Sequence, residues 1–177
     1  MNGGPDWRMT AHDDRRAMHL DKSIPKPLRI RTADEADLPG LATLYEQLNP
    51  EDETPSPSDG ARILEQFQLY PGSAIFVGSL GLELVTTCAL IVVPNLTRSG
   101  MPYALIENVV TDKNYRKCGY GKAVLREAVA SAWHHQCYKV MLLTGSNDPG
   151  TLKFYDDAGF EQSKVGFQIR RIPARES

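Results

Sequence analysis

Apolar positions recur three or four residues apart in three stretches of the chain, which predicts amphipathic helices. The helical spacing is carried by Leu38, Leu41, Leu44, Tyr45 and Leu48 in the first stretch, by Ile63, Leu64 and Phe67 in the second, and by Val124, Leu125, Ala128, Val129 and Ala132 in the third. Thr32 and Glu35 have the spacing of a capping box before the first helix. A fourth, short helix follows Asp148 as N-cap and Pro149 at the first helical position, and Gly159 ends it.

Short runs rich in β-branched and aromatic residues predict strands between these helices. The runs are "LRIRT" (28–32), "SAIFVGS" (73–79), "LELVTTCALIVVP" (82–94), "YALIENVVT" (103–111) and "YKVMLLT" (138–144), and "EQSKVGFQIRRI" (161–172) closes with one or two more. Gly81 turns the chain between the second and third runs, so these two strands are expected to be antiparallel neighbours.

The second half of the chain reads strand, loop, helix, strand, helix, which implies a right-handed crossover between two parallel strands. We therefore expect an α/β (α+β) fold, with a mixed, mostly antiparallel sheet of six to seven strands and helices on both faces. The predicted domain covers residues 28–172, between a polar tail at 1–27 and a short tail at 173–177.

The composition argues against nucleic-acid-binding, membrane-bound and metal-binding classes of protein. The formal charge of −2 gives no reason to expect nucleic-acid or membrane binding. Cys88, Cys118 and Cys137 lack the spacing of a disulfide framework or a zinc site, so no metal is expected. No signal peptide or membrane span is recognisable, and a cytoplasmic location is the expectation.

The stretch "NYRKCGYGKAVLREAV", which begins at Asn114, places cations and two glycines around the start of the third helix. A helix start has unpaired N–H groups and a partial positive charge, so it attracts phosphate. Gly119 and Gly121 permit a close approach, while Arg116, Lys117 and Lys122 add full charges. The Walker and dinucleotide spacings both fail here. These residues fit a pyrophosphate, although glycines and cations also begin ordinary solvated helices.

The segment Arg116–Gly121 resembles the R-x-x-G-x-G signature of the GNAT superfamily of acetyl-CoA-dependent N-acetyltransferases. "IENVVTDKNY" and "LKFYDDAGF" also resemble that family's acetyl-CoA strand and its terminal helix and turn, in the right order. The resemblance covers roughly residues 28–172, and its specific part runs from Glu107 to Phe160.

The resemblance implies a fold with a splayed sheet, and acetyl-CoA as cosubstrate. It assigns cofactor binding to Val109, Val110, Thr111, Arg116, Lys117, Cys118, Gly119, Tyr120, Gly121, Lys122, Asn147 and Tyr155. It also places Glu107 as general base and Tyr155 as general acid, with a strand amide such as that of Val110 facing the oxyanion. Simpler readings stay open, because Glu107 fits a solvent-facing strand position and Tyr155 fits aromatic packing against Leu152.

The expected reaction is acetyl transfer to a primary amine by direct attack in a ternary complex. The acceptor is a small-molecule or peptide amine, and a homodimer is consistent with the resemblance. One alternative is a non-catalytic module that binds or senses acyl-CoA on the same fold. Another is an enzyme that binds a different phosphorylated ligand at residues 116–122, which we call the cationic corner.

Overall fold

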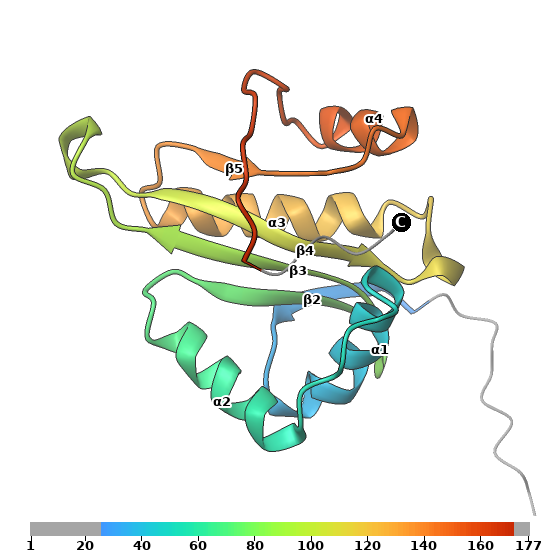
Figure 1. Ribbon diagram of the computed structural model, residues 1–177. Helices are drawn as coiled ribbons and strands as arrows, with labels where there is room; N and C mark the ends of the chain where they lie inside the picture. The colour runs from blue at the N-terminus through green and yellow to red at the C-terminus, as the bar shows by residue number, and fades with distance from the viewer. Residues whose placement is uncertain (1–25, 172–177) are drawn as a thin grey trace, which may run out of the picture.

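The computed structural model describes residues 26–171, and Figure 1 shows a single sheet with helices on both of its faces. The strands are β1 (Leu28–Thr32), β2 (Ala74–Leu80), β3 (Glu83–Val93), β4 (Tyr103–Thr111) and β5 (Val140–Leu142). The helices are α1 (Leu38–Leu48), α2 (Pro57–Gln68), α3 (Tyr120–His134) and α4 (Pro149–Asp157), with short 3-10 turns η1 (Glu35–Asp37), η2 (Arg98–Gly100) and η3 (Lys113–Tyr115).

The strands lie in sequence order across the sheet, β1-β2-β3-β4-β5. The first four are antiparallel neighbours, and β4 and β5 run parallel, with α3 as the crossover between them. Gly81, at φ 68°, turns the chain from β2 into β3. The predicted antiparallel pair and the parallel crossover are both confirmed.

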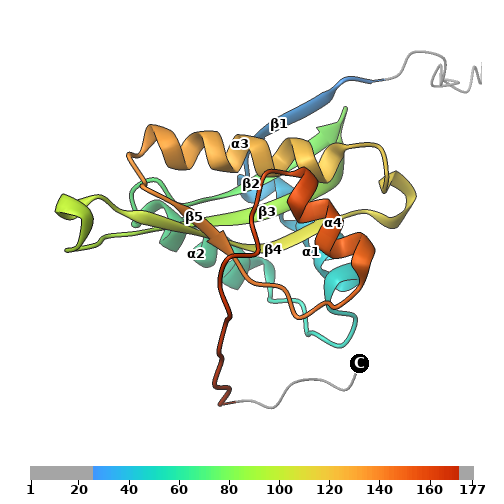
Figure 2. The same ribbon diagram turned by 90° about the horizontal axis from the view of Figure 1, so that it is seen from above.

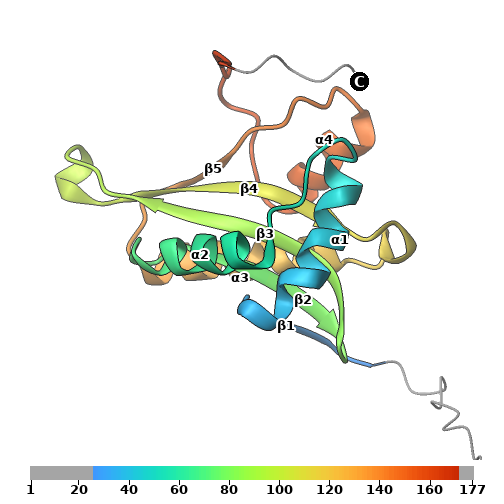
Figure 3. The same ribbon diagram turned by 60° about the horizontal axis from the view of Figure 1, so that its bottom comes forward.

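Each face of the sheet has its own apolar core. On one face, Leu90 and Ile106 pack against Val124 and Leu125 of α3, and side chains of α4 complete this cluster. On the other face, the cluster combines side chains of α1 and α2 with Val77 and Ala89 of the sheet. Figure 2 shows α3 running along the strands, and Figure 3 shows α1 and α2 in front of the sheet. β3 is buried almost continuously because its side chains, which alternate between the two faces, enter both cores.

The prediction of six to seven strands is wrong, because the sheet has five strands among the described residues. "EQSKVGFQIRRI" does alternate apolar and polar residues up to Arg171, but these residues pair with no described strand. A strand requires backbone partners as well as an alternating pattern. The capping box is also displaced, since Asp34 and Asp37 form it around η1 in place of Thr32 and Glu35.

The predicted tails lie largely outside the described residues, which exclude 1–25 and 172–177. Within residues 26–171, no helix combines the length and the apolar character that crossing a membrane requires.

Candidate functional site

The parallel strands β4 and β5 diverge halfway along β4. β5 pairs with β4 only from Ala104 to Ile106, opposite Val140–Leu142. Beyond Ile106, residues 107–111 of β4 stay paired with β3 but have no described strand on their other side. Backbone groups on that side of the strand are therefore available to an extended ligand.

A β-bulge coincides with this parting. The register between β3 and β4 shifts between Thr87 and Ala89, and Asn108 on β4 takes a positive φ of 52°. Asparagine is one of the few residues that adopt this conformation at modest cost. Beyond the bulge, the buried Thr86 hydroxyl donates to the Val110 carbonyl at 3.0 Å and lies 3.0 Å from the Thr111 hydroxyl. β3 therefore holds the end of β4 in place.

The end of β4 leads to the N-terminus of α3, where Gly119 is the N-cap with φ 83°. No side chain caps this helix, and its first intrahelical bond runs from the Ala123 amide to the Gly119 carbonyl at 3.0 Å. The amides of Tyr120, Gly121 and Lys122 precede that bond, so the helix itself supplies them with no acceptor. This is the arrangement that binds anions at helix N-termini.

The two glycines of the corner have different roles. A Cβ added to Gly119 would meet no atom within 4 Å, so the space beside this backbone is open. A Cβ added to Gly121 would lie 3.0 Å from the Thr111 hydroxyl oxygen and 3.1 Å from Cζ of Phe154. Gly121 therefore lets α3 pack closely against β4 and α4. Both glycines were expected to leave space for a ligand, and only Gly119 does so.

The cations of the corner are also unequal. Arg116 and Lys117 are exposed, and Arg116 Nε donates to the Thr111 carbonyl at 3.3 Å. Lys122 Nζ instead lies 2.9 Å from a carboxylate oxygen of Asp157, which links α3 to α4. Lys122, together with Lys153, lowers the pKa of Asp157 to about 2. The Lys122 ammonium is thus already paired within the protein, whereas Arg116 and Lys117 have no acidic partner in the described structure.

The loop between β4 and α3 is braced by Gln47 on α1, a residue that sequence reasoning missed. The Gln47 side-chain amide donates to the Asp112 carboxylate at 2.7 Å, and its oxygen accepts from the Lys113 amide at 2.9 Å. Asp112 in turn accepts from the Asn114 amide at 2.8 Å and begins η3. No local pattern indicates this contact, because the partners lie 65 and 66 residues apart in the sequence.

The two predicted catalytic side chains lie close enough for Glu107 to affect the pKa of Tyr155. Tyr155 is half-buried, with its ring centroid 5.0 Å from that of Phe154 and 6.4 Å from that of Phe160. Burial raises the pKa of Tyr155, and the nearby Glu107 carboxylate raises it further because it disfavours a second negative charge. Glu107 is exposed at the position where β4 and β5 diverge. Tyr155 therefore keeps its hydroxyl proton at neutral pH.

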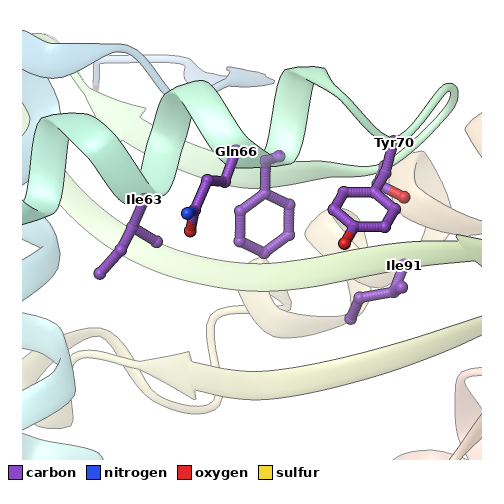
Figure 4. Close-up of a pocket in the computed structure, with 6 residues that line it drawn as sticks. Ile63, Gln66, Tyr70 and Ile91 are labelled. Atoms are coloured by element: carbon purple, nitrogen blue, oxygen red, sulfur yellow. The ribbon is translucent and has the colours of Figure 1, made fainter.

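Two further features lie outside this constellation. Asp148 caps α4 by accepting from the Thr151 amide at 2.8 Å, while the neighbouring Asn147 is exposed. An apolar groove between α2 and β3, shown in Figure 4, contains none of the predicted site residues. Among the described residues, no group of three His, Cys, Asp or Glu side chains could hold a metal ion.

Comparisons with known proteins agree with this fold. The model of the acetyltransferase (GNAT) family matches residues 41–160. A solved structure from Agrobacterium tumefaciens str. C58, provisionally assigned as an acetyltransferase, is 46% identical with a TM-score of 0.76, over 81% of this chain and 99% of that one. An acetyltransferase structure from Trypanosoma brucei is 27% identical with a TM-score of 0.72, over 81% and 99%.

A glucosamine 6-phosphate N-acetyltransferase of Trypanosoma brucei brucei is 35% identical over 78 residues. These residues make up 44% of this chain and 51% of the relative, so the match spans about half of that protein.

The Gln47 contacts generate a prediction about the loop at residues 112–119. Gln47→Ala removes both hydrogen bonds, and one neutral bond contributes about 1 kcal/mol. We expect the Lys113 amide to exchange with solvent about fivefold faster, as measured by hydrogen exchange. Glu46→Ala, on the exposed side of the same helix, is the control. Equal exchange rates in the two variants would show that Gln47 does not brace the loop.

Proposed function

Because the chain belongs to the acetyltransferase (GNAT) family, we propose that it moves an acetyl group from acetyl-CoA to the amine of a small phosphorylated amino sugar. The family model covers residues 41–160, and this membership makes the protein an acetyltransferase enzyme. The transfer is direct, within a ternary complex. One observation carries the proposal: the open edge of β4 runs from Glu107 at the divergence of the strands to the uncapped start of α3.

The cosubstrate fits this path from end to end. The diphosphate has the amides of Tyr120, Gly121 and Lys122 as donors, with open space at Gly119 and the side chains of Arg116 and Lys117 exposed nearby. The pantetheine arm carries amides, and the open side of Val109–Thr111 can pair with them as a further strand would. Bound along this path, acetyl-CoA would supply the acetyl group as a thioester.

The chain's own residues then manage two protons. A primary amine with a pKa near 10.4 is mostly protonated at neutral pH, so it needs a base before it attacks. Glu107 accepts that proton, directly or through a water. The nitrogen forms its bond to the acetyl carbon, the carbon–sulfur bond breaks, and Tyr155 donates its hydroxyl proton to the departing sulfur. The second proton that the nitrogen loses restores the Tyr155 hydroxyl. A thiol pKa of about 8.5 makes the last step inexpensive. A strand amide such as that of Val110 stabilises the oxyanion.

A covalent acetyl-cysteine route has less support. Cys88 and Cys137 are buried, and burial raises the pKa of both thiols, that of Cys88 to about 12. Cys118 is exposed, and its sulfur lies 3.6 Å from the Arg116 carbonyl, which is not a base that could activate a thiol. No described cysteine has the activation that a nucleophile needs.

The proposed acceptor class is taken by analogy from the relative named as a glucosamine 6-phosphate N-acetyltransferase. We expect this chain to release coenzyme A thiol when given acetyl-CoA and glucosamine 6-phosphate, as measured with a thiol reagent. Glucose 6-phosphate lacks the amine, and glucosamine lacks the phosphate, so these two compounds are matched controls. We expect no release with the first and a lower kcat/KM with the second. Turnover of another amine class in preference to glucosamine 6-phosphate would contradict the acceptor assignment and leave the acetyl transfer intact.

Tyr155→Phe tests the general acid while keeping the ring and its packing. We expect kcat to fall about 10²-fold, the lower end of general acid–base contributions, with acetyl-CoA affinity by calorimetry unchanged. Since the pKa of Tyr155 is raised above 10.0, the wild-type rate keeps this acid through neutral pH and loses it only at more alkaline pH. Tyr70→Phe, on the exposed groove, is the control. An unchanged kcat would remove Tyr155 from the chemistry.

Glu107→Gln tests the general base with a side chain of the same size. We expect kcat/KM at neutral pH to fall about 10²-fold or more. The residual rate should climb with pH, because more of the acceptor amine is then already deprotonated. The control is Glu127→Gln, an exposed carboxylate on α3. A pH–rate profile that matches the wild type would assign the proton to another group.

A further inference from the structure

Helix α4 carries the proposed general acid, Tyr155, yet none of its residues is fully buried. The side chains that attach this part of the chain to the core are only partly buried, and they are Phe154, Tyr155, Ala158 and Phe160. Figures 1 and 2 both show α4 lying over the end of α3 where that helix begins. The position of α4 therefore depends on a small number of contacts with its surroundings.

Two of these contacts reach the first turn of α3. Phe154 packs where Gly121 has no side chain, since a Cβ added there would lie 3.1 Å from Cζ of the phenylalanine. Asp157 accepts from Lys122 Nζ at one carboxylate oxygen, at 2.9 Å, and from Lys153 Nζ at the other, also at 2.9 Å. The bond from Lys153 stays within α4. Among the described residues, the pair of Lys122 with Asp157 is thus the ion pair that joins the two helices.

This pair is charged and partly shielded from solvent. The two ammonium groups lower the pKa of Asp157 to about 2, so the carboxylate is ionised at neutral pH. The side chains of Lys122 and Asp157 are 32% and 35% exposed, which means that solvent reaches the pair without surrounding it. Tyr155 lies two residues before Asp157 on the same helix. A displacement of α4 at this pair therefore also displaces the phenol.

The same pair withholds a cation from the start of α3. Lys122 is the third residue of the helix, and helical side chains tilt toward the N-terminus of their helix. A free Lys122 ammonium can therefore extend toward the uncapped amides of Tyr120 and Gly121, where the diphosphate is proposed to bind. With Asp157 in place, the ammonium is held against α4, and a carboxylate stands beside the first turn. Both effects oppose the binding of an anion there.

We propose that Asp157 is a positioning residue for the reaction: by binding Lys122 it fixes α4, and with it Tyr155, and at the same time it weakens the binding of the diphosphate. This inference rests on the proposed function, in which Tyr155 protonates the departing sulfur and the start of α3 holds the diphosphate. A contact that only stabilised the fold would support binding and turnover together. Asp157 acts on the two in opposite directions, and this difference can be measured.

Asp157→Asn tests the proposal with a side chain of the same size. With acetyl-CoA and glucosamine 6-phosphate, we expect kcat to fall about tenfold, because a small displacement of a catalytic group is costly. Coenzyme A should bind about fivefold more tightly by calorimetry, because Lys122 is released and a negative charge is lost. Amides of residues 152–158 should exchange faster with solvent. The control is Asp156→Asn, which makes the same charge change at an exposed neighbour on α4 and should leave kcat and affinity within about twofold.

Lys122→Met breaks the same pair from the other side. We expect kcat to fall as in Asp157→Asn, while coenzyme A affinity falls instead of rising, because the ammonium is gone and the carboxylate remains. The double variant of Lys122→Met with Asp157→Asn should have the kcat of either single variant, since both remove one interaction. Lys153→Met removes only the bond within α4 and should keep kcat within about twofold of the wild type. Circular dichroism checks that each variant folds.

Loss of affinity together with kcat in Asp157→Asn would show a structural role alone and overturn the proposal. Results for Asp157→Asn that match Asp156→Asn would overturn it as well. Failure of the proposed function has a different signature, because the wild type would then bind no coenzyme A, or Tyr155→Phe would keep its kcat. Calorimetry and hydrogen exchange use no amine, so they decide the role of Asp157 whichever acceptor the chain uses.

Discussion

The site depends on one constraint, the unequal pairing of the two edges of β4. One edge is paired with β3 on both sides of the bulge, while β5 follows the other edge only as far as Ile106. Backbone N–H and C=O groups that a neighbouring strand would otherwise pair with are thereby left for a ligand. The bulge at Asn108 changes the direction of the strand at the same point. Because the pairing with β3 continues, the open stretch is held rigidly and needs no ordering when a ligand arrives.

At the end of β4 and the start of α3, the backbone is held in place by contacts that involve no ligand. Thr86 fixes the carbonyl of Val110, Gln47 fixes the loop at Asp112 and Lys113, and the missing side chain of Gly121 lets α3 approach Thr111. The ion pair of Lys122 with Asp157 then ties the first turn of α3 to α4, which also carries Tyr155. The amides proposed to bind the diphosphate and the proposed acid are thus positioned by one connected set of contacts, so a disturbance of α4 reaches both.

The elements that could be predicted from sequence are those with strong local signals. Helical spacing located α1 to α3, Asp148, Pro149 and Gly159 bounded α4, and Gly81 marked the turn between β2 and β3. The bulge at Asn108 and the brace by Gln47 could not be predicted, because both arise from contacts with β3 or with residues far along the chain. The closing strands were overpredicted for the reciprocal reason: Val165, Phe167 and Ile169 have a strand's pattern, but a pattern does not supply the partner that a strand requires.

Backbone groups are proposed to bind acetyl-CoA, and side chains must select the amine. This difference explains why the family is easier to recognise than the acceptor. The proposed grip on acetyl-CoA uses amides of β4 and of the start of α3, which tolerate many side chains as long as Gly119 and Gly121 are kept. Selectivity for an amine must instead come from side chains around Glu107, since the backbone there is common to any strand that diverges in this way. Of the described elements, α1 packs against β4 and α4 carries Tyr155, so these two helices are placed to supply such side chains.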